Sequence, residues 1–518
     1  MVHTKNILFI FTLFLCNATN VISYAQAPSI NWQKSLGGSG NDYAYCIQQT
    51  GDNGYIVTGS SNSNDYDVSG NHGDYDIWVV KLDDTGAIMW QKSLGGSGTD
   101  VSSCIQQTID SGYIIAGSSK SIDGDVTQNH GGYDCWIIKL SSNGNIQWQK
   151  SFGGSADDNA YSVKQTSDSG YIIAGQSSSN DGDVTGHHGV SGSADFWVIK
   201  LSSSGSLQWQ KCLGGTGNDN AICIQQTSDG GYVVTGDSYS NDGDVTGNHG
   251  GEDYWVVKLT PSGSIQWQKT FGGTGSDYAQ SIVQTSDNGY IIAGGSNSND
   301  MDVSGNVGMG DYWVVKLTST GSLQWQKCLG GTKDDAANCV QVTSDGGYIV
   351  TGWVSSNDGD VTGFHGSDDY WVVKLSATGS VEWQKAMGSL GMDVAWYVLP
   401  TRDSGYIVAG YTFYSGGDVT FNYGHNDFWI VKLNDLANVF VVKKDLSIYL
   451  MPNPASSTIS VIGAGNVKIC VYNTSGSLVK EVDNSDHIYL SEFPPGMYLI
   501  RLFNKSGKMI KQEKIIKE

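Results

Sequence analysis

The tripeptide Trp-Gln-Lys returns seven times along the chain at nearly constant spacing. Its tryptophans are Trp32, Trp90, Trp148, Trp209, Trp267, Trp325 and Trp383. Successive tryptophans are 58 residues apart, except for an interval of 61 residues between Trp148 and Trp209. A period this regular indicates one supersecondary unit copied seven times, whose apolar faces are buried only against neighbouring copies. The repeat therefore constrains the architecture more than it constrains the function.

Each repeat predicts four β-strands, as the copy that begins at Asp219 illustrates. Residues 221–227 are an apolar stretch, a Ser-Asp-Gly-Gly turn follows, and residues 232–236 form a second strand. After a polar loop, residues 254–259 are apolar on both faces, which is typical of a strand covered on both sides. Residues 265–268 alternate apolar and polar side chains, as a half-exposed edge strand does. Four such strands describe a propeller blade.

The two ends of the repeat region complement each other. The region opens at residues 30–34 with a fourth strand that lacks the first three, and it ends at residues 427–433 with a third strand that lacks a fourth. Pairing these segments would complete the last blade and remove exposed strand edges. We therefore predict an all-β, seven-bladed β-propeller over residues 28–434, closed by its amino-terminal strand. An open solenoid is the alternative, but it would leave both ends unpaired.

One stretch of the repeat also carries a family resemblance. Residues 37–45 (Gly-Gly-Ser-Gly-Asn-Asp-Tyr-Ala-Tyr) run into residues 52–59 (Asp-Asn-Gly-Tyr-Ile-Val-Thr-Gly), and together they resemble the bacterial seven-bladed β-propeller repeat family. The resemblance covers residues 30–434 in all seven copies. Because that family has no single assigned activity, the resemblance implies the fold and leaves the function open.

The amino-terminal residues have the pattern of an export signal. Lys5 precedes an apolar run over residues 7–16, and small residues follow at Ala25 and Ala27. We predict a signal peptide over residues 1–25. No later segment approaches the roughly 18 unbroken apolar residues of a membrane span, so we expect no transmembrane segment in the mature chain.

The composition changes after the last repeat. We expect a linker at residues 435–445 and a small antiparallel β-sandwich at residues 446–518. The motifs Met-Pro-Asn-Pro (451–454), Val-Tyr-Asn-Thr-Ser-Gly (471–476) and Pro-Gly-Met-Tyr-Leu-Ile (495–500) resemble the type A carboxy-terminal sorting domain of type IX secretion cargo, although Met451 stands where that family usually has an aromatic residue. The resemblance implies type IX secretion machinery as a partner, and the cell surface or the medium as the destination. The sorting-motif residues are Pro452, Asn453, Pro454, Gly496 and Tyr498.

Aspartate recurs at four positions in every repeat and accounts for most of the formal net charge of −22. A residue needed in every copy is normally a structural part, because aspartate in turns accepts backbone hydrogen bonds. The acidity argues against nucleic acid as a partner.

The Asp-Gly-Asp motifs of the long loops are candidate ligands of a cation. Calcium prefers oxygen ligands, so calcium is the one cofactor that the sequence suggests. The alternative is that these aspartates cap turns, since no copy shows a fuller Asp-x-Asp-x-Asp-Gly ladder. The candidate metal ligands are Asp242, Asp244, Asp358 and Asp360.

Departures from the repeat mark a candidate ligand site. Fourteen of the 16 tryptophans occupy two repeat positions, and Trp353 and Trp396 are the exceptions. With the tyrosines near them they predict an aromatic platform for a sugar or a protein. Packing at the seam of the ring is the alternative. The predicted ligand-binding residues are Trp353, Trp396, Tyr411, Tyr414 and Tyr423.

Residues that would mark an enzyme are scarce in the repeats. Sialidase-like propellers clamp a carboxylate with several arginines, whereas the repeats contain only Arg402. A glycosidase could use a pair of aspartates, but nothing distinguishes one pair from its copies. The sequence predicts no catalytic residues and favours an exported binding or adhesion module with a surface glycan or protein as partner. A carbohydrate-active hydrolase or lyase and a calcium-stabilised structural surface protein are the alternatives.

Four cysteines leave one question open. Cys212 and Cys223, and likewise Cys328 and Cys339, lie close enough in sequence to form bridges in an oxidising compartment. Free buried thiols are the alternative that we favour.

Overall fold

The computed structural model describes residues 26–189, 192–434, 449–451, 455–462, 467–504 and 507–518. These residues form strands and turns, and none of them lies in a helix. Among them there is consequently no helix that could cross a membrane. The chain divides into two compact units, Met1–Ala437 and Asn438–Glu518. The predicted signal peptide (1–25) and linker (435–445) lie outside the described residues.

Antiparallel four-stranded sheets build the first unit, and its described residues contain seven of them. Sheets 1 to 6 each use four consecutive strands. Sheet 1 contains β2 (Asp42–Gln49), β3 (Tyr55–Ser61), β4 (Asp76–Leu82) and β5 (Ile88–Leu94). Sheet 2 contains β6 (Asp100–Gln107), β7 (Tyr113–Ser119), β8 (Asp134–Leu140) and β9 (Ile146–Phe152). Sheet 3 contains β10 (Asp158–Gln165), β11 (Tyr171–Ser177), β12 (Asp195–Leu201) and β13 (Leu207–Leu213).

The remaining sheets repeat this order. Sheet 4 contains β14 (Asp219–Gln226), β15 (Tyr232–Ser238), β16 (Asp253–Leu259) and β17 (Ile265–Phe271). Sheet 5 contains β18 (Asp277–Gln284), β19 (Tyr290–Ser296), β20 (Asp311–Leu317) and β21 (Leu323–Leu329). Sheet 6 contains β22 (Asp335–Val342), β23 (Tyr348–Val354), β24 (Asp369–Leu375) and β25 (Val381–Met387). Sheet 7 combines β26 (Asp393–Pro400), β27 (Tyr406–Thr412) and β28 (Asp427–Leu433) with the amino-terminal β1 (Ile30–Leu36).

The amino-terminal strand lies antiparallel beside β28. Trp32 is opposite Lys432, and Ser35 is opposite Trp429. The indole Nε1 of Trp429 donates to Oε1 of Gln33 at 2.9 Å. In sheets 1 to 6 the third-strand tryptophan makes the same bond to the glutamine of its own fourth strand, as Trp78 does to Gln91 at 2.9 Å. β1 thus supplies the position that a fourth strand has in every other sheet.

The repeated tryptophan of the fourth strand lies between sheets. The ring of Trp32 meets the ring of Tyr55 in sheet 1 edge-on, with centroids 5.8 Å apart. Trp90 meets Tyr113 of the next sheet in the same way, at 5.9 Å. Second and third strands are buried along their whole length, as β3 and β4 show, whereas fourth strands are half exposed. This burial pattern is the one that the apolar pattern of the repeat predicts.

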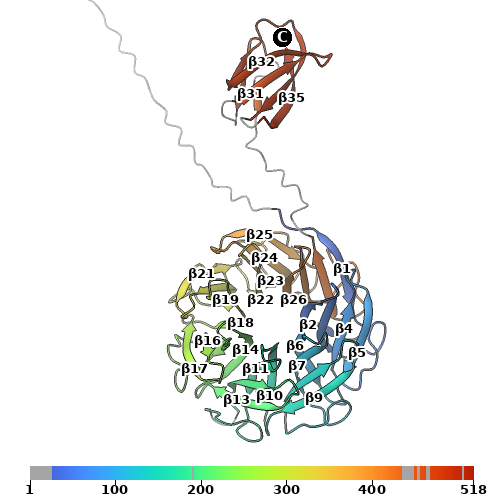
Figure 1. The fold of residues 1–518 in the computed structure, drawn as a ribbon, viewed down its shortest axis with the longest axis vertical. Coiled ribbons are helices and arrows are strands. Elements are labelled where there is room, and N and C mark those ends of the chain that lie inside the picture. Colours follow the sequence, from blue (N-terminus) through green and yellow to red (C-terminus); the bar gives the residue numbers. More distant parts are fainter. Residues whose placement is uncertain (1–25, 190–191, 435–448, 452–454, 463–466, 505–506) are drawn as a thin grey trace, which may run out of the picture. The chain divides into compact units, whose positions relative to one another are not determined.

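First strands are the innermost strands of the first unit. Each contacts the first strand of the next sheet, from β2 and β6 through to β22 and β26, and β26 in turn contacts β2. Figure 1 shows the sheets following one another around this centre, in the style of propeller blades.

Two sheets form the second unit. One contains β29 (Tyr449–Met451), β30 (Thr458–Ile462) and β33 (His487–Tyr489), and the other contains β31 (Val467–Tyr472), β32 (Leu478–Ser485), β34 (Gly496–Phe503) and β35 (Met509–Lys517). Ile459, Ile469 and Ile500 belong to one buried cluster that both sheets share. Of the sorting-motif residues, Pro452, Asn453 and Pro454 lie outside the described residues. Gly496 begins β34, and the buried Tyr498 donates its hydroxyl to the carbonyl oxygen of Pro494 at 2.9 Å.

Candidate functional site

Most of the recurring charges stabilise the repeat. The buried Lys200 of β12 pairs with Asp168 in the turn between β10 and β11, at 3.0 Å. Burial alone would raise the pKa of Asp168, but hydrogen bonds from Thr166 and Lys200 outweigh it and lower the pKa to about 2. Every sheet repeats this ion pair at 2.9 to 3.0 Å: Lys81–Asp52, Lys139–Asp110, Lys200–Asp168, Lys258–Asp229, Lys316–Asp287, Lys374–Asp345 and Lys432–Asp403.

At each junction between sheets, two further aspartates lie beside one glycine. At the junction of sheets 7 and 1, a Cβ added to Gly37 would lie 2.4 Å from Oδ1 of Asp427 and 2.6 Å from Oδ2 of Asp42, so the two buried carboxylates flank this glycine. Burial raises the pKa of Asp427 to about 7, and Asp42 adds to the shift. The Oδ1 atom of the third-strand aspartate has no hydrogen-bond partner among the described residues in any of the seven copies: Asp76, Asp134, Asp195, Asp253, Asp311, Asp369 and Asp427.

The predicted metal ligands tie loops to strand ends. Oδ1 and Oδ2 of Asp242 accept hydrogen bonds from N and Oγ1 of Thr216 at 2.7 and 2.9 Å. Asp358 binds Thr332 in the same way, at 2.8 and 2.9 Å. The described residues contain no group of three or more His, Cys, Asp or Glu side chains placed to hold a metal ion. Both oxygens of Asp242 and of Asp358 thus accept protein donors, as in the alternative in which these aspartates cap turns, and calcium binding stays a prediction.

The second aspartate of each motif is held differently. Oδ2 of Asp244 accepts a hydrogen bond from the amide of Gly214 at 3.4 Å and lies 3.6 Å from Nε2 of His188. The backbone amide of Asp360 donates to the carbonyl oxygen of Gly330 at 2.9 Å.

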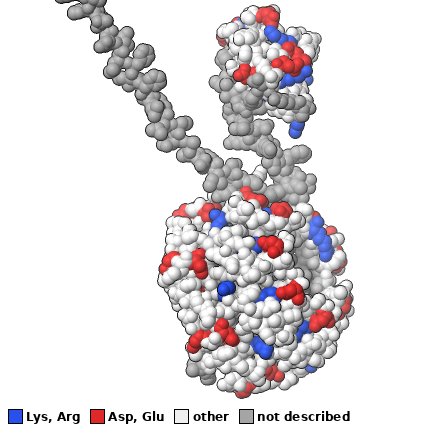
Figure 2. Space-filling model, turned by 60° about the vertical axis from the view of Figure 1, so that its left-hand side comes forward, with Lys and Arg blue, Asp and Glu red and all other residues white. Residues whose placement is uncertain are grey.

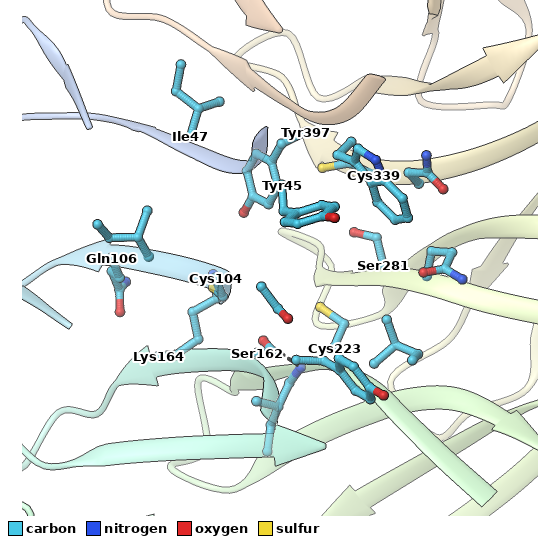
Figure 3. Close-up of a pocket in the computed structure, with 18 of the residues that line it drawn as sticks. Tyr45, Ile47, Cys104, Gln106, Ser162, Lys164, Cys223, Ser281, Cys339 and Tyr397 are labelled. Carbon is cyan, nitrogen blue, oxygen red and sulfur yellow. Dashed lines mark hydrogen bonds between the residues drawn. The ribbon is translucent and has the colours of Figure 1, made fainter. Parts of the chain in front are cut away.

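A central cavity contains several residues that differ from their equivalents in the other repeats. It has a volume of about 630 Å³ and is lined by the first strands of all seven sheets (Figure 3). This volume lies within the range of small-molecule sites. Its apolar wall includes the half-buried Val101, Ile222, Val283 and Leu399.

One ring of residues, all of which except Cys46 line the cavity, carries thiols and hydroxyls, and several of these link neighbouring sheets. Sγ of Cys46 donates to the carbonyl oxygen of Ile105 at 3.6 Å, and Sγ of Cys104 donates to that of Val163 at 3.7 Å. In sheet 7 this position holds a tyrosine. The seven residues are Cys46, Cys104, Ser162, Cys223, Ser281, Cys339 and Tyr397.

The described cysteines are free thiols, and the favoured alternative for the four cysteines of the sequence therefore agrees with the structure. Free Cys212, Cys223, Cys328 and Cys339 are all buried or half-buried. The sulfurs of Cys46 and Cys104 lie 4.0 Å apart.

A lysine interrupts the next ring of lining residues. At the positions equivalent to Lys164, four sheets have glutamine and two have an aliphatic residue: Gln48, Gln106, Gln225, Val283, Gln341 and Leu399. Oε1 of Gln106 accepts the backbone N–H of Gln165 at 2.6 Å, and Gln225 accepts that of Gln284 at 2.8 Å. Lys164 cannot accept such a bond, because an ammonium group has only donors. Its side chain is half-buried and lines the cavity (Figure 3).

Aromatic rings join two of the predicted ligand-binding residues at one side of this cavity. Tyr45 meets Trp396 edge-on at 5.5 Å, and both line the cavity. Tyr43 connects this pair to Tyr411, through contacts of 6.4 Å with Tyr45 and 4.9 Å with Tyr411. Tyr43 and Tyr45 escaped the sequence analysis because tyrosine is common throughout the repeats. The signal that would have found them is their place beside Trp396 on neighbouring first strands.

The other three predicted ligand-binding residues lie elsewhere. Tyr423 packs against Phe421 at 4.7 Å and against Tyr66 at 4.9 Å, on the loop side of sheets 7 and 1. Tyr414 packs against Phe413 at 4.5 Å. Trp353 is half-buried in β23, opposite Ala336 and Tyr370 of its own sheet. The predicted platform is therefore divided between a cavity wall and an outer loop cluster.

One acidic residue stands apart from the repeated aspartates. Asp237 occupies in β15 the position that Tyr411 has in β27, and it is buried. Burial raises its pKa to about 7, against a hydrogen bond from Asn220 at 2.8 Å, and Glu252 adds to the shift. Its charge acts on Tyr161, which lines the cavity.

Comparison with known proteins identifies the function of the second unit. Residues 447–518 match the family described as "Secretion system C-terminal sorting domain". This match supports export through type IX secretion and is consistent with a location at the cell surface or outside the cell. The sorting domain therefore implies the type IX secretion machinery as a partner of the chain.

Similarities of the repeats to known proteins are weak. Over 172 residues the chain is 26% identical to "Regulatory protein FlaEY" of Caulobacter vibrioides. This alignment covers 30% of this chain but only 17% of that protein. Among solved structures, a fungal alcohol oxidase in complex with copper aligns over 95% of this chain and 100% of its own, with 13% identity and a TM-score of 0.43. BamB from Moraxella catarrhalis aligns over 78% and 88%, with 14% identity and a TM-score of 0.36. Values this low transfer no activity to this chain.

Proposed function

We propose that the protein is an exported binding module, a closed seven-bladed β-propeller that captures a ligand in its central cavity and leaves the cell through its carboxy-terminal sorting domain. The cavity carries the proposal. It is built from strands of all seven sheets, and it concentrates residues that the other copies lack, namely Lys164, Tyr397 and Trp396. Because the other copies fold without these residues, the repeat fold does not require them, and this supports a binding role for them.

The seam between sheets 7 and 1 supports a closed ring. The backbone amide of Arg402 donates to Oε1 of Gln49 at 3.0 Å, and its Nη1 donates to the carbonyl oxygen of Thr50 at 2.7 Å and to Oδ1 of Asn53 at 3.1 Å. The equivalent residues of the other copies are glycine, isoleucine or serine. Arginine therefore adds bonds at the one junction that joins the two ends of the repeat region.

Charge on the surface is compatible with an extracellular module and offers no nucleic-acid site on the face in view. Figure 2 shows acidic side chains spread over that face of the first unit, with basic ones interspersed rather than gathered in a patch. The outer loop cluster of Tyr66, Phe421 and Tyr423 is the second place where a surface glycan or protein would dock.

A ligand screen with cavity and surface variants tests the proposal. The mature protein is screened by thermal shift against oligosaccharides and small organic molecules. Trp396→Ala is expected to abolish the shift caused by a cavity ligand, whereas Tyr414→Ala, in the outer loops, is expected to leave it unchanged. Ligands that depend on Tyr414 and not on Trp396 would move the binding site to the outer surface and contradict the cavity.

Asp237 favours a carbohydrate-active enzyme as the second candidate. A buried carboxyl group whose pKa is about 7 is still protonated in about half of the molecules at neutral pH, which suits a general acid. This alternative predicts turnover of a polysaccharide by the mature protein, with the activity lost in Asp237→Asn. Binding without turnover in both proteins would exclude Asp237 as an acid catalyst for that polysaccharide.

A further inference from the structure

We propose that the ligand of the central cavity is a small carboxylate with an apolar or aromatic body, and that Lys164 binds its carboxylate group. This inference rests on the proposed function and names the ligand class. It starts from a contrast among the lysines of the first unit. The seven third-strand lysines each have an aspartate partner, whereas no carboxylate of the described residues lies within the 4.0 Å limit of an ion pair with Lys164.

An unpaired ammonium group on the wall of a half-buried cavity is stabilised by a bound anion. Removing a cation from water is costly unless an anion and hydrogen bonds compensate it. Glutamine would serve a structural role without burying a charge. Four sheets have glutamine at the equivalent position, where Gln106 and Gln225 bond to neighbouring strands. Lys164 therefore gives up a strand-to-strand hydrogen bond and places a positive charge in the cavity.

The groups around Lys164 supply little negative charge. Its electrostatic neighbours are the phenol of Tyr397 and the thiols Cys104, Cys46 and Cys223. Burial raises the pKa of Tyr397, so the phenol is neutral at neutral pH. Cys104 is the exception, because a hydrogen bond from Cys46, assisted by Lys164, lowers its pKa. A Cys104 thiolate, which would give up the bond to the carbonyl oxygen of Val163, is thus the internal competitor among these neighbours for the role of counter-ion.

The rest of the cavity fits the body of the proposed ligand. Tyr45 and Trp396 form an aromatic wall, and the half-buried Ile222 and Val283 contribute aliphatic surface. Nε1 of Trp396 is buried and has no acceptor among the described residues. An unpaired cation on the cavity wall indicates a ligand with an anionic oxygen group.

Titration calorimetry on the mature full-length protein tests the carboxylate requirement. The probes are a panel of aryl- and alkyl-carboxylates led by 4-phenylbutyrate, with 4-phenylbutanamide as the neutral isostere and acetate as the carboxylate without a body. We expect 4-phenylbutyrate to bind at least about tenfold more tightly than the amide, because a hydrogen-bonded charge pair is worth at least that factor. It should also bind more tightly than acetate, because acetate has no apolar body to bury. Lys164→Gln should remove this preference and leave the binding of the amide unchanged.

Matched variants separate the competing explanations. Glutamine is native at the equivalent positions, so Lys164→Gln is expected to fold, and Lys211→Gln removes an exposed lysine as the control. Cys104→Ser should retain carboxylate binding. Loss of carboxylate binding in Cys104→Ser, or equal binding of acid and amide, would overturn the inference.

The outcomes also separate this inference from the proposed function. If neutral probes bind in a manner that depends on Trp396 but not on Lys164, the cavity is a binding site and the carboxylate class is wrong. If no member of the panel and no neutral probe binds, both the inference and the cavity function fail.

Discussion

At the scale of single residues, the repeated tripeptide has a separate role for each of its first two members. Tryptophan packs against a tyrosine of the next sheet, as Trp209 does against Tyr232 at 5.9 Å. Glutamine accepts the indole N–H of the neighbouring strand, as Gln210 does from Trp197 at 2.9 Å. The period of the tripeptide and the alternation of apolar and polar side chains around it are visible in the sequence. The bonds could not be assigned from the sequence, because they join side chains of different strands or sheets.

Loss of one such glutamine should destabilise the fold measurably. Gln210→Leu leaves the indole N–H of the buried Trp197 without an acceptor, which costs about 1–3 kcal/mol of unfolding free energy. Gln208→Leu, on an exposed position of the same strand, is the control and should change stability little. Denaturant unfolding of both variants checks the difference. Equal stability of the two variants would show that the bond contributes nothing.

The candidate site was less predictable than the repeat at this scale. Trp396 and Tyr411 were recognised because they depart from the repeat, and the structure joins them through Tyr43 and Tyr45. Lys164 departs from the repeat equally clearly. It was missed because lysine is unremarkable on a protein surface, and only the ring of first strands shows that its side chain faces a cavity.

At the scale of elements, aspartate side chains tie the long loops to the segments that precede the first strands. Asp242 and Asp358 accept two hydrogen bonds each from a threonine at the end of the preceding sheet. An excess of EDTA should therefore leave the melting temperature unchanged, while Thr216→Val, which removes one donor, should lower it slightly. Differential scanning calorimetry measures both. A fall in melting temperature on chelation, restored by calcium, would show that the loops do bind the ion.

The amino-terminal strand is the element on which the proposed closed ring depends. Removal of residues 26–36 exposes the edge of β28 and deprives Trp429 of its Gln33 acceptor. We expect fast amide hydrogen exchange in β28 of this truncated protein, with aggregation at high concentration. β12, a third strand inside sheet 3, is the internal control and should remain protected. Unchanged protection of β28 would mean that β1 does not complete the sheet.

At the scale of the whole molecule, the fold shifts the pKa values of two sets of aspartates in opposite directions. Burial raises the pKa of Asp427 to about 7 and those of Asp311 and Asp393 to about 6. These groups take up protons in the folded state before the unfolded chain does, so they stabilise the fold as the pH falls from about 7 towards 4. The pKa values of ion-paired aspartates such as Asp168 are lowered to about 2, so their contribution is present above about pH 4 and is lost as the pH falls through 2.

The protein should consequently be most stable in mildly acidic solution. We expect the melting temperature to rise by a few degrees between pH 8 and about pH 5 and to fall below about pH 4. Asp427→Asn should flatten the rise, because asparagine does not titrate. Thermal unfolding across this pH range checks the profile. A melting temperature that falls steadily from pH 8 to pH 5 would contradict the assignment of raised pKa values to the junction aspartates.

Whole-molecule features were predicted where they follow from counting and patterning. The four-stranded units, the pairing of the first strand with the last and the separate carboxy-terminal domain all follow from the period and the composition of the sequence. The cavity does not, because its size and its asymmetric lining arise only when seven strands separated by hundreds of residues are brought together.

The most direct test of the account is an anomalous diffraction measurement on crystals of the mature protein soaked in 4-bromobenzoate. The account predicts a bromine peak inside the cavity, with the carboxylate about 3 Å from Nζ of Lys164. Bromine peaks confined to lysines of the outer surface, with the cavity empty of the probe, would contradict it.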